Sequence, residues 1–331
     1  MSRAQAIELV RNGNRFLVTC HRRPDADALG SAIGFAEVLR KLGKEASVFS
    51  PDEPAASIAF LPGIYDVLRT IPAGTAPFDA TFVTDTASGS LLPKGLPAHD
   101  VTGPIVALDH HVSFDDFADV VVRDDSMAAT GELVLDMAVE LGVRPSDLSL
   151  EGATCLYAAL VADTGGFRYA CTRSRTLRFA AELLDMGVDP WRVASNLFEH
   201  WAPERLQLLQ AALAGMELNF GNRFALLTVT QDMLKATGAT SEMIDGLVNY
   251  ARKVHGVEVA ALLWEQDAAS SDLGNVPSTR VSFRAAGDVD VAKLAASLGG
   301  GGHRAASAAT LPVDVATAKS KLFDAARALF A

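Results

Sequence analysis

The sequence has few cysteines and no long apolar run. Its three cysteines, Cys20, Cys155 and Cys171, form no CxxC pair. So sparse and odd a set excludes a disulfide framework and is typical of a reducing compartment. No apolar stretch approaches the roughly 18 residues that a membrane span needs. Charges interrupt the apolar runs of the first eighteen residues, so we expect no signal peptide, a cytoplasmic location and no membrane partner.

Basic residues are also in short supply. The chain has 29 Lys and Arg against 40 Asp and Glu, which gives a net charge of −11. Proteins that hold long nucleic acids by their phosphates, or that dock on anionic lipid, usually present basic surfaces. The acidic balance argues against both activities. It leaves room for a small anionic substrate at a locally positive site, because net charge does not fix local potential.

Strand and helix patterns alternate in the first half of the chain. Short, continuously apolar strands separated by helices predict an α/β domain, whose parallel sheet is covered by helices on both faces. The expected strands are 15–20, 46–49, 78–85, 104–109 and 119–122, and the expected helices are 28–42, 130–141, 148–162 and 174–186.

The second half predicts a smaller α/β domain with a mixed sheet. Its expected strands are 224–230, 257–264 and 279–284, and its expected helices are 243–253, 291–298 and 315–330. At roughly 100–200 residues per domain, a chain of 331 residues should form two or three domains. We place them at 1–187 and 222–331, with 188–221 as a helical linker broken by Pro203.

Polar side chains gather where the strands of the first domain end. Ligands of parallel sheets bind outside the carboxyl ends of the strands, so these residues are expected to share one rim. They are His21, Asp25, Asp27, Asp85, Asp109, His110 and His111.

This set of residue types suits divalent cations. Hard and borderline cations take carboxylate and imidazole ligands, and two cations about 3.5–4 Å apart need at least one bridging carboxylate. Asp163 is a further candidate, because an acidic residue closing an apolar helix opposes the helix dipole. Each residue alone also fits a structural role, with Asp25 as a turn residue and Asp27 as a helix N-cap. Their joint order along the chain favours the metal site.

The motifs resemble those of a known family. The stretches His21-x3-Asp25-x-Asp27, Asp85-Thr86-Ala87, Asp109-His110-His111 and Asp163-Thr164-Gly165-Gly166-Phe167 are similar to the four motifs of the DHH phosphoesterases. The segments 246–250, 281–284 and 299–303 resemble their DHH-associated C-terminal domain. The resemblance covers about residues 5–312. The two-domain layout is similar to the nanoRNase/pAp phosphatase branch, the bifunctional oligoribonucleases.

The resemblance implies a role for each matching residue of the first domain. One cation would be held by His21, Asp25 and Asp85. The second would be held by Asp27, Asp85, His110 and Asp163, with Asp85 as the bridge. Manganese is the family's usual metal. Asp109 would orient an imidazole, and His111 would face the substrate phosphate as a donor or as an acid.

The resemblance also implies that the second domain binds the substrate. The residues concerned are Asn249, Arg284, Gly300, Gly301, Gly302 and His303. Glycines let a backbone approach a phosphate closely, but they also suit a flexible loop or a helix C-cap. Arg284 and Asn249 also fit solvated surface positions. The Ser that often follows this Arg in the family is Ala285 here, which leaves the number of phosphate donors open.

The implied activity is manganese-dependent phosphoester hydrolysis by water that two cations activate. Substrates would be short oligoribonucleotides and linear dinucleotides such as pApA, cleaved to mononucleotides, and pAp, cleaved to AMP and phosphate. A homodimer is a further expectation from the family. The alternatives are a cyclic di-AMP phosphodiesterase, an inorganic pyrophosphatase and a non-catalytic nucleotide sensor. A pyrophosphatase would end in a Lys- and Arg-rich motif, and a sensor would lack a metal ligand.

Overall fold

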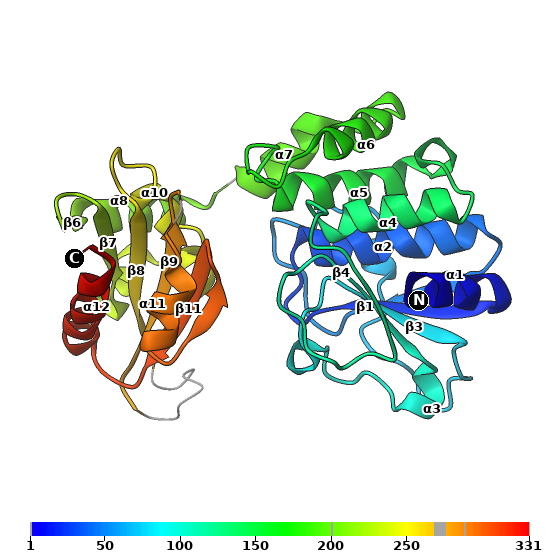
Figure 1. The fold of residues 1–331 in the computed structure, drawn as a ribbon, viewed down its shortest axis with the longest axis horizontal. Coiled ribbons are helices and arrows are strands. Elements are labelled where there is room, and N and C mark those ends of the chain that lie inside the picture. The colour runs from blue at the N-terminus through cyan, green and yellow to red at the C-terminus, as the bar shows by residue number, and fades with distance from the viewer. Residues whose placement is uncertain (1, 200, 268–275, 288, 331) are drawn as a thin grey trace. The chain divides into compact units, whose positions relative to one another are not determined.

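The computed structural model describes the chain except for residues 1, 200, 268–275, 288 and 331, and it is drawn in Figure 1. It divides into two compact units, Met1–His200 and Trp201–Ala331. The predicted linker contributes to both, because α7 (Pro190–Phe198) lies in the first unit and α8 (Pro203–Ala214) lies in the second. The domain boundaries within this segment therefore stay a prediction.

The first unit is built on a five-stranded parallel sheet, which confirms the predicted α/β class. Its strands are β1 (Arg15–Cys20), β2 (Glu45–Phe49), β3 (Ala80–Thr84), β4 (Ile105–Asp109) and β5 (Val120–Arg123). The strand order is β2-β1-β3-β4-β5. This order changes direction between β1 and β3. A sheet of this kind binds its ligand at that switch point, outside the carboxyl ends of the strands.

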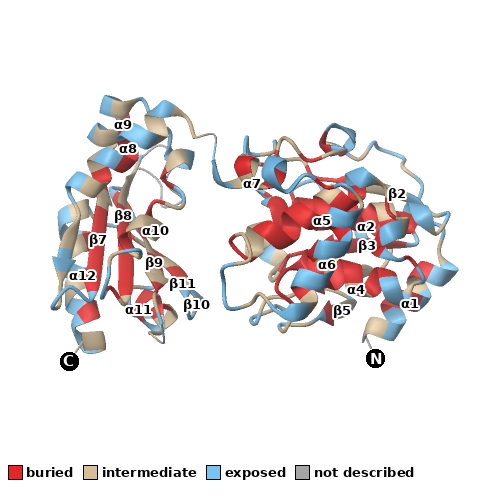
Figure 2. Ribbon diagram, turned by 90° about the horizontal axis from the view of Figure 1, so that it is seen from above, coloured by how far each residue is buried: buried red, intermediate tan, exposed pale blue. Residues whose placement is uncertain are grey.

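Long helices cover one face of this sheet and share its main hydrophobic core. They are α1 (Ser2–Asn12), α2 (Ala26–Lys41), α4 (Thr130–Glu140) and α5 (Leu150–Asp163), and α6 (Ser174–Asp185) packs outside them. Figure 2 shows α2 and α5 buried along most of their length. On the other face, Leu17 and Phe49 pack against Val101 of the short helix α3 (His99–Thr102).

Two glycines explain how closely α2 and α5 approach each other. A Cβ at Gly30 would lie 2.6 Å from the carbonyl oxygen of Cys155, and one at Gly34 would lie 2.4 Å from Leu156 Cγ. The first overlap could be relieved only by a shift of backbone, and the second only by a shift of the Leu156 side chain. The close contact of the two helices fixes Asp27, near the start of α2, relative to Asp163, at the end of α5.

The second unit contains a six-stranded mixed sheet, as predicted. Its strands are β6 (Glu217–Asn219), β7 (Phe224–Val229), β8 (Val259–Gln266), β9 (Ser278–Ala285), β10 (Gly301–His303) and β11 (Ala306–Leu311), in the order β10-β11-β9-β8-β7-β6. Strands β7 and β8 are parallel and the other pairs are antiparallel. One face carries α11 (Val291–Ser297) and α12 (Val315–Phe330). The other face carries α8, α9 (Gln231–Thr237) and α10 (Val248–Ala251) over β7 and β8.

Three details of the second unit differ from the sequence-based expectation. Strand β6 lies within the segment 188–221 that was predicted to be a helical linker. The helix expected at 243–253 is interrupted, since a 3-10 turn at Ser241–Ile244 precedes the short α10. Gly246, with φ +83°, separates the two pieces by a left-handed backbone that a continuous helix cannot contain. Strands β10 and β11 were not expected, because glycine and alanine dominate their sequences and both residues disfavour strands. Within the described residues, no helix combines the length and the apolar character of a membrane span.

Candidate metal centre

The predicted metal ligands converge at the carboxyl ends of β1, β3 and β4. Their ligand atoms form three overlapping groups, and within each group all atoms lie within 4.8 Å of one another. The groups are His21 with Asp25 and Asp85, Asp27 with His110 and Asp163, and Asp85 with His110 and His111. The cluster therefore sits at the switch point of the sheet, and it unites residues from four separate segments of the chain.

Asp85 connects the groups. Its Oδ2 lies 3.6 Å from His21 Nε2, and its Oδ1 lies 3.5 Å from His110 Nε2. The residue follows β3 directly and adopts a left-handed backbone, with φ +53°. Aspartate tolerates this conformation better than most side chains, and such strain is often retained where a functional geometry requires it. The turn places one carboxylate within reach of both imidazoles.

Asp27 is fully buried and is held by the start of α4. Its carboxylate accepts hydrogen bonds from Thr130 N (2.7 Å), Gly131 N (2.9 Å) and Ser31 Oγ (3.0 Å). Helix α4 begins after Ala129, which cannot cap it, so Asp27 supplies the missing acceptor from another helix. The possible N-cap role assigned to Asp27 in its own helix is wrong. Asp25 fills that role in α2, accepting from Ala28 N at 3.0 Å.

Backbone carbonyls orient two of the imidazoles. His21 Nδ1 lies 3.0 Å from the carbonyl oxygen of Arg22, and His110 Nδ1 lies 3.4 Å from that of Met127. Both rings therefore direct Nε2 toward carboxylates, and His110 Nε2 lies 3.1 Å from Asp163 Oδ2. A ligating histidine is commonly oriented in this way, through its second nitrogen.

Asp109 holds the third imidazole. Its Oδ1 accepts from His111 Nδ1 at 2.7 Å and from His110 N at 2.8 Å. Asp109 is fully buried, and its Oδ2 has no hydrogen-bond partner among the described residues. A buried carboxylate oxygen without a partner is costly. The mixed imidazole and carboxylate donor set of the three groups fits a site for divalent cations.

The electrostatics of the cluster agree with that fit. Burial, followed by the negative charges of Asp85 and Asp163, raises the pKa of Asp25 to about 6. Burial lowers the pKa of the imidazoles, but hydrogen bonds to the carboxylates outweigh it and raise the pKa of His21 to about 9 and that of His110 to about 12. Without a cation, this cluster retains protons at neutral pH. A divalent cation would supply the same positive charge.

In the second unit, Arg284 lies on β9 and pairs with Ala306 on β11, which pairs in turn with His303 on β10. The side chain of His303 lies outside the described part of the structure. Arg284 also pairs with Ala260 on β8. Ala260 belongs to the hydrophobic core beneath α10. Directly paired residues of an antiparallel sheet point to one face, so Arg284 lies on the sheet face that carries α10, the helix of Asn249.

In the glycine-rich segment 299–303, packing requires glycine at some positions and leaves space for a side chain at another. Gly299, with φ +80°, terminates α11. It therefore has the helix C-cap role that the sequence left open as an alternative. A Cβ at Gly300 would lie 2.1 Å from the carbonyl oxygen of Ala308, and one at Gly302 would lie 2.6 Å from Ser307 Cα. Close packing therefore requires these two glycines. Gly301 is exposed, and a Cβ there would meet no described atom within 4 Å.

The sequence-based interpretation missed the residues that support the ligands from the start of α4. Thr130 Oγ1 donates to Asp85 Oδ1 at 3.0 Å, in addition to the bond from its backbone N to Asp27. One signal for this contact exists in the sequence. The predicted helix at 130–141 follows two alanines and has no N-cap residue of its own, so a cap from elsewhere in the chain was to be expected.

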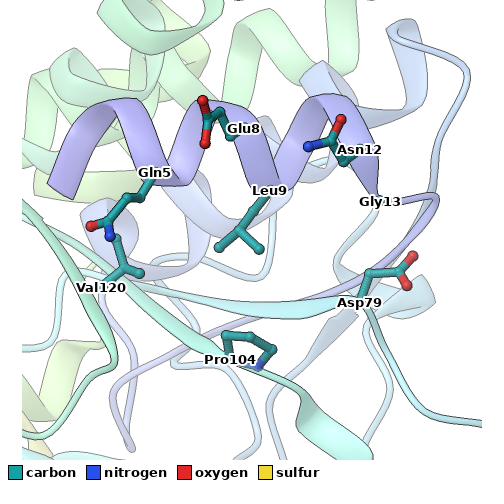
Figure 3. A pocket seen from close by; sticks show the side chains of 8 residues that line it. All are labelled: Gln5, Glu8, Leu9, Asn12, Gly13, Asp79, Pro104 and Val120. Carbon is teal, nitrogen blue, oxygen red and sulfur yellow. The ribbon is translucent and has the colours of Figure 1, made fainter. Parts of the chain in front are cut away.

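A cavity of about 500 Å³ lies at the amino ends of the strands of the same sheet, opposite the metal cluster (Figure 3). It is lined by α1 and by residues at the amino ends of the strands, including Asp79 and Pro104. The Asp79 carboxylate accepts from Asn14 N and Arg15 N, so it has a structural role. Among the described residues, this lining contains neither histidine nor cysteine, whereas the cluster at the carboxyl ends of the strands contains three histidines.

Comparisons with known proteins agree with the motifs. The model of the DHH family, N-terminal domain, matches residues 15–160, and that of the DHHA1 domain matches residues 223–331. A bifunctional oligoribonuclease and PAP phosphatase NrnA from Thermus thermophilus is 33% identical over 315 residues, which are 94% of this chain and 88% of that protein. The protein of the same name from Bacillus subtilis is 27% identical over 294 residues, covering 88% of this chain and 87% of that protein.

One solved structure is similar in fold. An exopolyphosphatase-related protein from Bacteroides fragilis superimposes with a TM-score of 0.88 at 22% sequence identity. The match covers 99% of this chain and 96% of the other. The likeness is therefore one of fold over both units.

Proposed function

The chain belongs to the DHH family of phosphoesterases, and from this premise we propose that it hydrolyses short oligoribonucleotides, linear dinucleotides such as pApA, and pAp. The single observation that carries the proposal is the cluster at the carboxyl ends of β1, β3 and β4, where imidazoles and carboxylates of all four motifs meet. The names of the relatives from Thermus thermophilus and Bacillus subtilis support the substrate class.

Two divalent cations are proposed as cofactors. Manganese is the metal that the family resemblance implies, and the mixed donor set is compatible with it. His21, Asp25 and Asp85 would hold one cation. Asp27, Asp85, His110 and Asp163 would hold the other. Bound there, they would polarise the phosphoryl oxygens and activate water for attack on phosphorus. The protein's own contribution is to fix the ligands, and Asp85 is placed to serve both sets.

His111 is proposed as the group that contacts the leaving oxygen. Asp109 binds its Nδ1, so the ring turns Nε2 away from that carboxylate. Burial lowers the pKa of His111, but the hydrogen bond with Asp109 and the charge of Asp85 outweigh it, and the pKa is raised. A raised pKa shifts the imidazole toward its protonated form. His111 can then donate a proton to the departing oxygen.

Substrate binding is assigned to the second unit. Arg284 would bind a phosphate through its guanidinium, and His303 would add a second donor. Of the predicted glycines Gly300, Gly301 and Gly302, Gly300 already donates its N–H to the carbonyl oxygen of Ala295 at 2.8 Å. Gly301 and Gly302, which are both exposed, would therefore be the ones to approach the phosphate. Asn249 would contact the nucleotide from α10. We further propose a cytoplasmic homodimer that acts on small nucleotides and not on long nucleic acids.

Parallel release assays test this function. Metal-stripped protein receives Mn²⁺ and is offered pAp, pApA, a five-residue RNA, cyclic di-AMP or pyrophosphate. We expect AMP from pAp and mononucleotides from pApA and the RNA. Release from pyrophosphate alone would identify an inorganic pyrophosphatase, and release from cyclic di-AMP alone would identify a cyclic dinucleotide phosphodiesterase. Binding without turnover of any compound would identify a sensor. Each of these three results would contradict the proposal.

A further inference from the structure

A charged residue beside the metal cluster remains outside the roles described so far. Glu132 lies in the first turn of α4 and is fully buried. Its Oε2 accepts hydrogen bonds from Ala128 N (2.7 Å) and Thr176 Oγ1 (3.1 Å), and its Oε1 accepts from Arg175 Nε (2.8 Å). The carboxylate thus joins the turn before α4 to the first turn of α6.

That turn and the first two residues of α4, together called the 127–131 turn, contact three of the proposed metal ligands. The Met127 carbonyl lies 3.4 Å from His110 Nδ1. Thr130 donates through Oγ1 to Asp85 and through its backbone N to Asp27. The positions of these backbone atoms therefore set the positions of ligand oxygens and of a ligand ring.

Arg175 contacts the same turn a second time. Its Nη2 lies 2.7 Å from Met127 Sδ, while its Nε binds Glu132. The Arg175 side chain is 35% exposed and that of Glu132 is fully buried. A buried ion pair is seldom the most stable solution for a core position, because desolvation of the charges offsets their attraction. The contacts of this pair with the 127–131 turn suit a role in fixing geometry more than one in stability.

We propose that Glu132 and Arg175 form a positioning pair for the metal centre. The pair holds the 127–131 turn so that Asp27, Asp85 and His110 keep the geometry that a divalent cation needs. Neither residue touches the cation or the substrate. The inference rests on the proposed function, because it takes the cluster to be a metal site.

Glu132→Gln is the sharpest variant for testing the pair. Glutamine keeps the shape of the side chain but replaces one oxygen by an NH₂ group. Both oxygens of Glu132 face donors, Ala128 N on one side and Arg175 Nε on the other. Either orientation of the amide therefore sets a donor against a donor. The turn should shift, and Mn²⁺ affinity should fall by roughly 10-fold or more.

The measurement is Mn²⁺ binding to metal-free protein, read from the electron paramagnetic resonance signal of free Mn²⁺. Glu140→Gln is the matched control, because Glu140 closes the same helix and pairs with Arg3 at 2.7 Å. We expect the wild-type affinity in this control and weaker binding in Glu132→Gln. Unchanged binding in Glu132→Gln, or an equal loss in Glu140→Gln, would overturn the proposal. Circular dichroism confirms that each variant is folded at the assay temperature.

Arg175 gives a second test if Glu132→Gln does not fold, since a partly exposed side chain tolerates substitution. Arg175→Gln leaves Glu132 unpaired and should weaken Mn²⁺ binding, whereas Arg175→Lys keeps the positive charge and should restore part of it. Equal, wild-type affinities in both would contradict the pair's role. A wild-type protein that binds no divalent cation would overturn the proposed function as well, so the two failures are distinguishable.

Discussion

At the scale of single residues, the metal centre depends on where each carboxylate is held. Asp85 is the clearest case, because its left-handed backbone directs one side chain to both His21 and His110. The residue types and their placement after strands could be predicted from the sequence, since both are local features. The backbone conformation of Asp85 could not, because it depends on the loops that pack around the end of β3.

Asp85→Asn should abolish binding of two cations per chain. Asparagine also tolerates the left-handed region, so the fold should persist while the negative charge is lost. Metal analysis of protein equilibrated with Mn²⁺ and desalted measures the stoichiometry. Asp79→Asn is the control, since Asp79 binds backbone N–H groups at the opposite edge of the sheet. Full Mn²⁺ loading in Asp85→Asn would contradict the bridging role.

Cation binding should release protons at pH 7. The pKa values of His21 and His110 are raised to about 9 and about 12, so both imidazoles are protonated in the cation-free protein. A cation must displace these protons. Affinity should therefore rise with pH, and less steeply above about pH 9, where His21 has lost its proton and His110 still carries one. Calorimetric titration in buffers of different ionisation enthalpy reports the number of protons, and the absence of any release would contradict the assigned ligands.

At the scale of elements, the strands and helices of the first unit could largely be predicted from the sequence. The contacts between helices that hold the metal ligands in place could not. Strand ends carry their own polar signals, so the ligands could be found from the sequence. The contact of Thr130 with Asp27 and Asp85 joins residues 103 and 45 positions apart, and only tertiary packing creates it. The same holds for the Glu132–Arg175 pair. In the second unit, Gly301–His303 forms a strand because β11 provides a partner, against the low strand propensity of glycine.

The contact between α2 and α5 gives a prediction at this scale. Gly30→Ala should lower the free energy of unfolding by about 1–3 kcal/mol, because its Cβ would overlap the Cys155 carbonyl at 2.6 Å. The shift of α2 should also weaken Mn²⁺ binding through Asp27. Denaturant unfolding measures the first effect. Gly215→Ala, with its nearest atom at 3.8 Å, should cost little, and an equal loss there would show that the tight contact is not the cause.

Strand β9 gives a second prediction. Arg284→Ala should raise the KM for pAp by roughly 10-fold or more, because a charge-assisted phosphate contact is lost. Arg280 lies earlier on the same face of β9 as Arg284. It pairs with Thr310 on β11 and with Trp264 on β8. Arg280→Ala is thus a matched control and should leave KM within about twofold of wild type. Similar KM values in the two variants would remove Arg284 from the phosphate site.

At the scale of the whole molecule, the net charge of −11 becomes consistent with a nucleotide substrate. Five carboxylates, those of Asp25, Asp27, Asp85, Asp109 and Asp163, lie in or beside the proposed centre. Two divalent cations would add four positive charges there and offset most of this negative charge. Elsewhere the acidic balance repels polyanions. The molecule should therefore favour short substrates over long nucleic acids.

Hydrolysis as a function of substrate length and metal tests the central claim most directly. Metal-stripped protein is assayed with pAp, pApA, and RNAs of five and twenty residues, with and without Mn²⁺. We predict no turnover without metal, release of AMP from pAp and mononucleotides from pApA with Mn²⁺, and a kcat/KM that falls steeply toward the longest RNA. Turnover that persists in excess chelator, or a preference for the twenty-residue RNA over pApA, would contradict a metal-dependent phosphoesterase for short substrates.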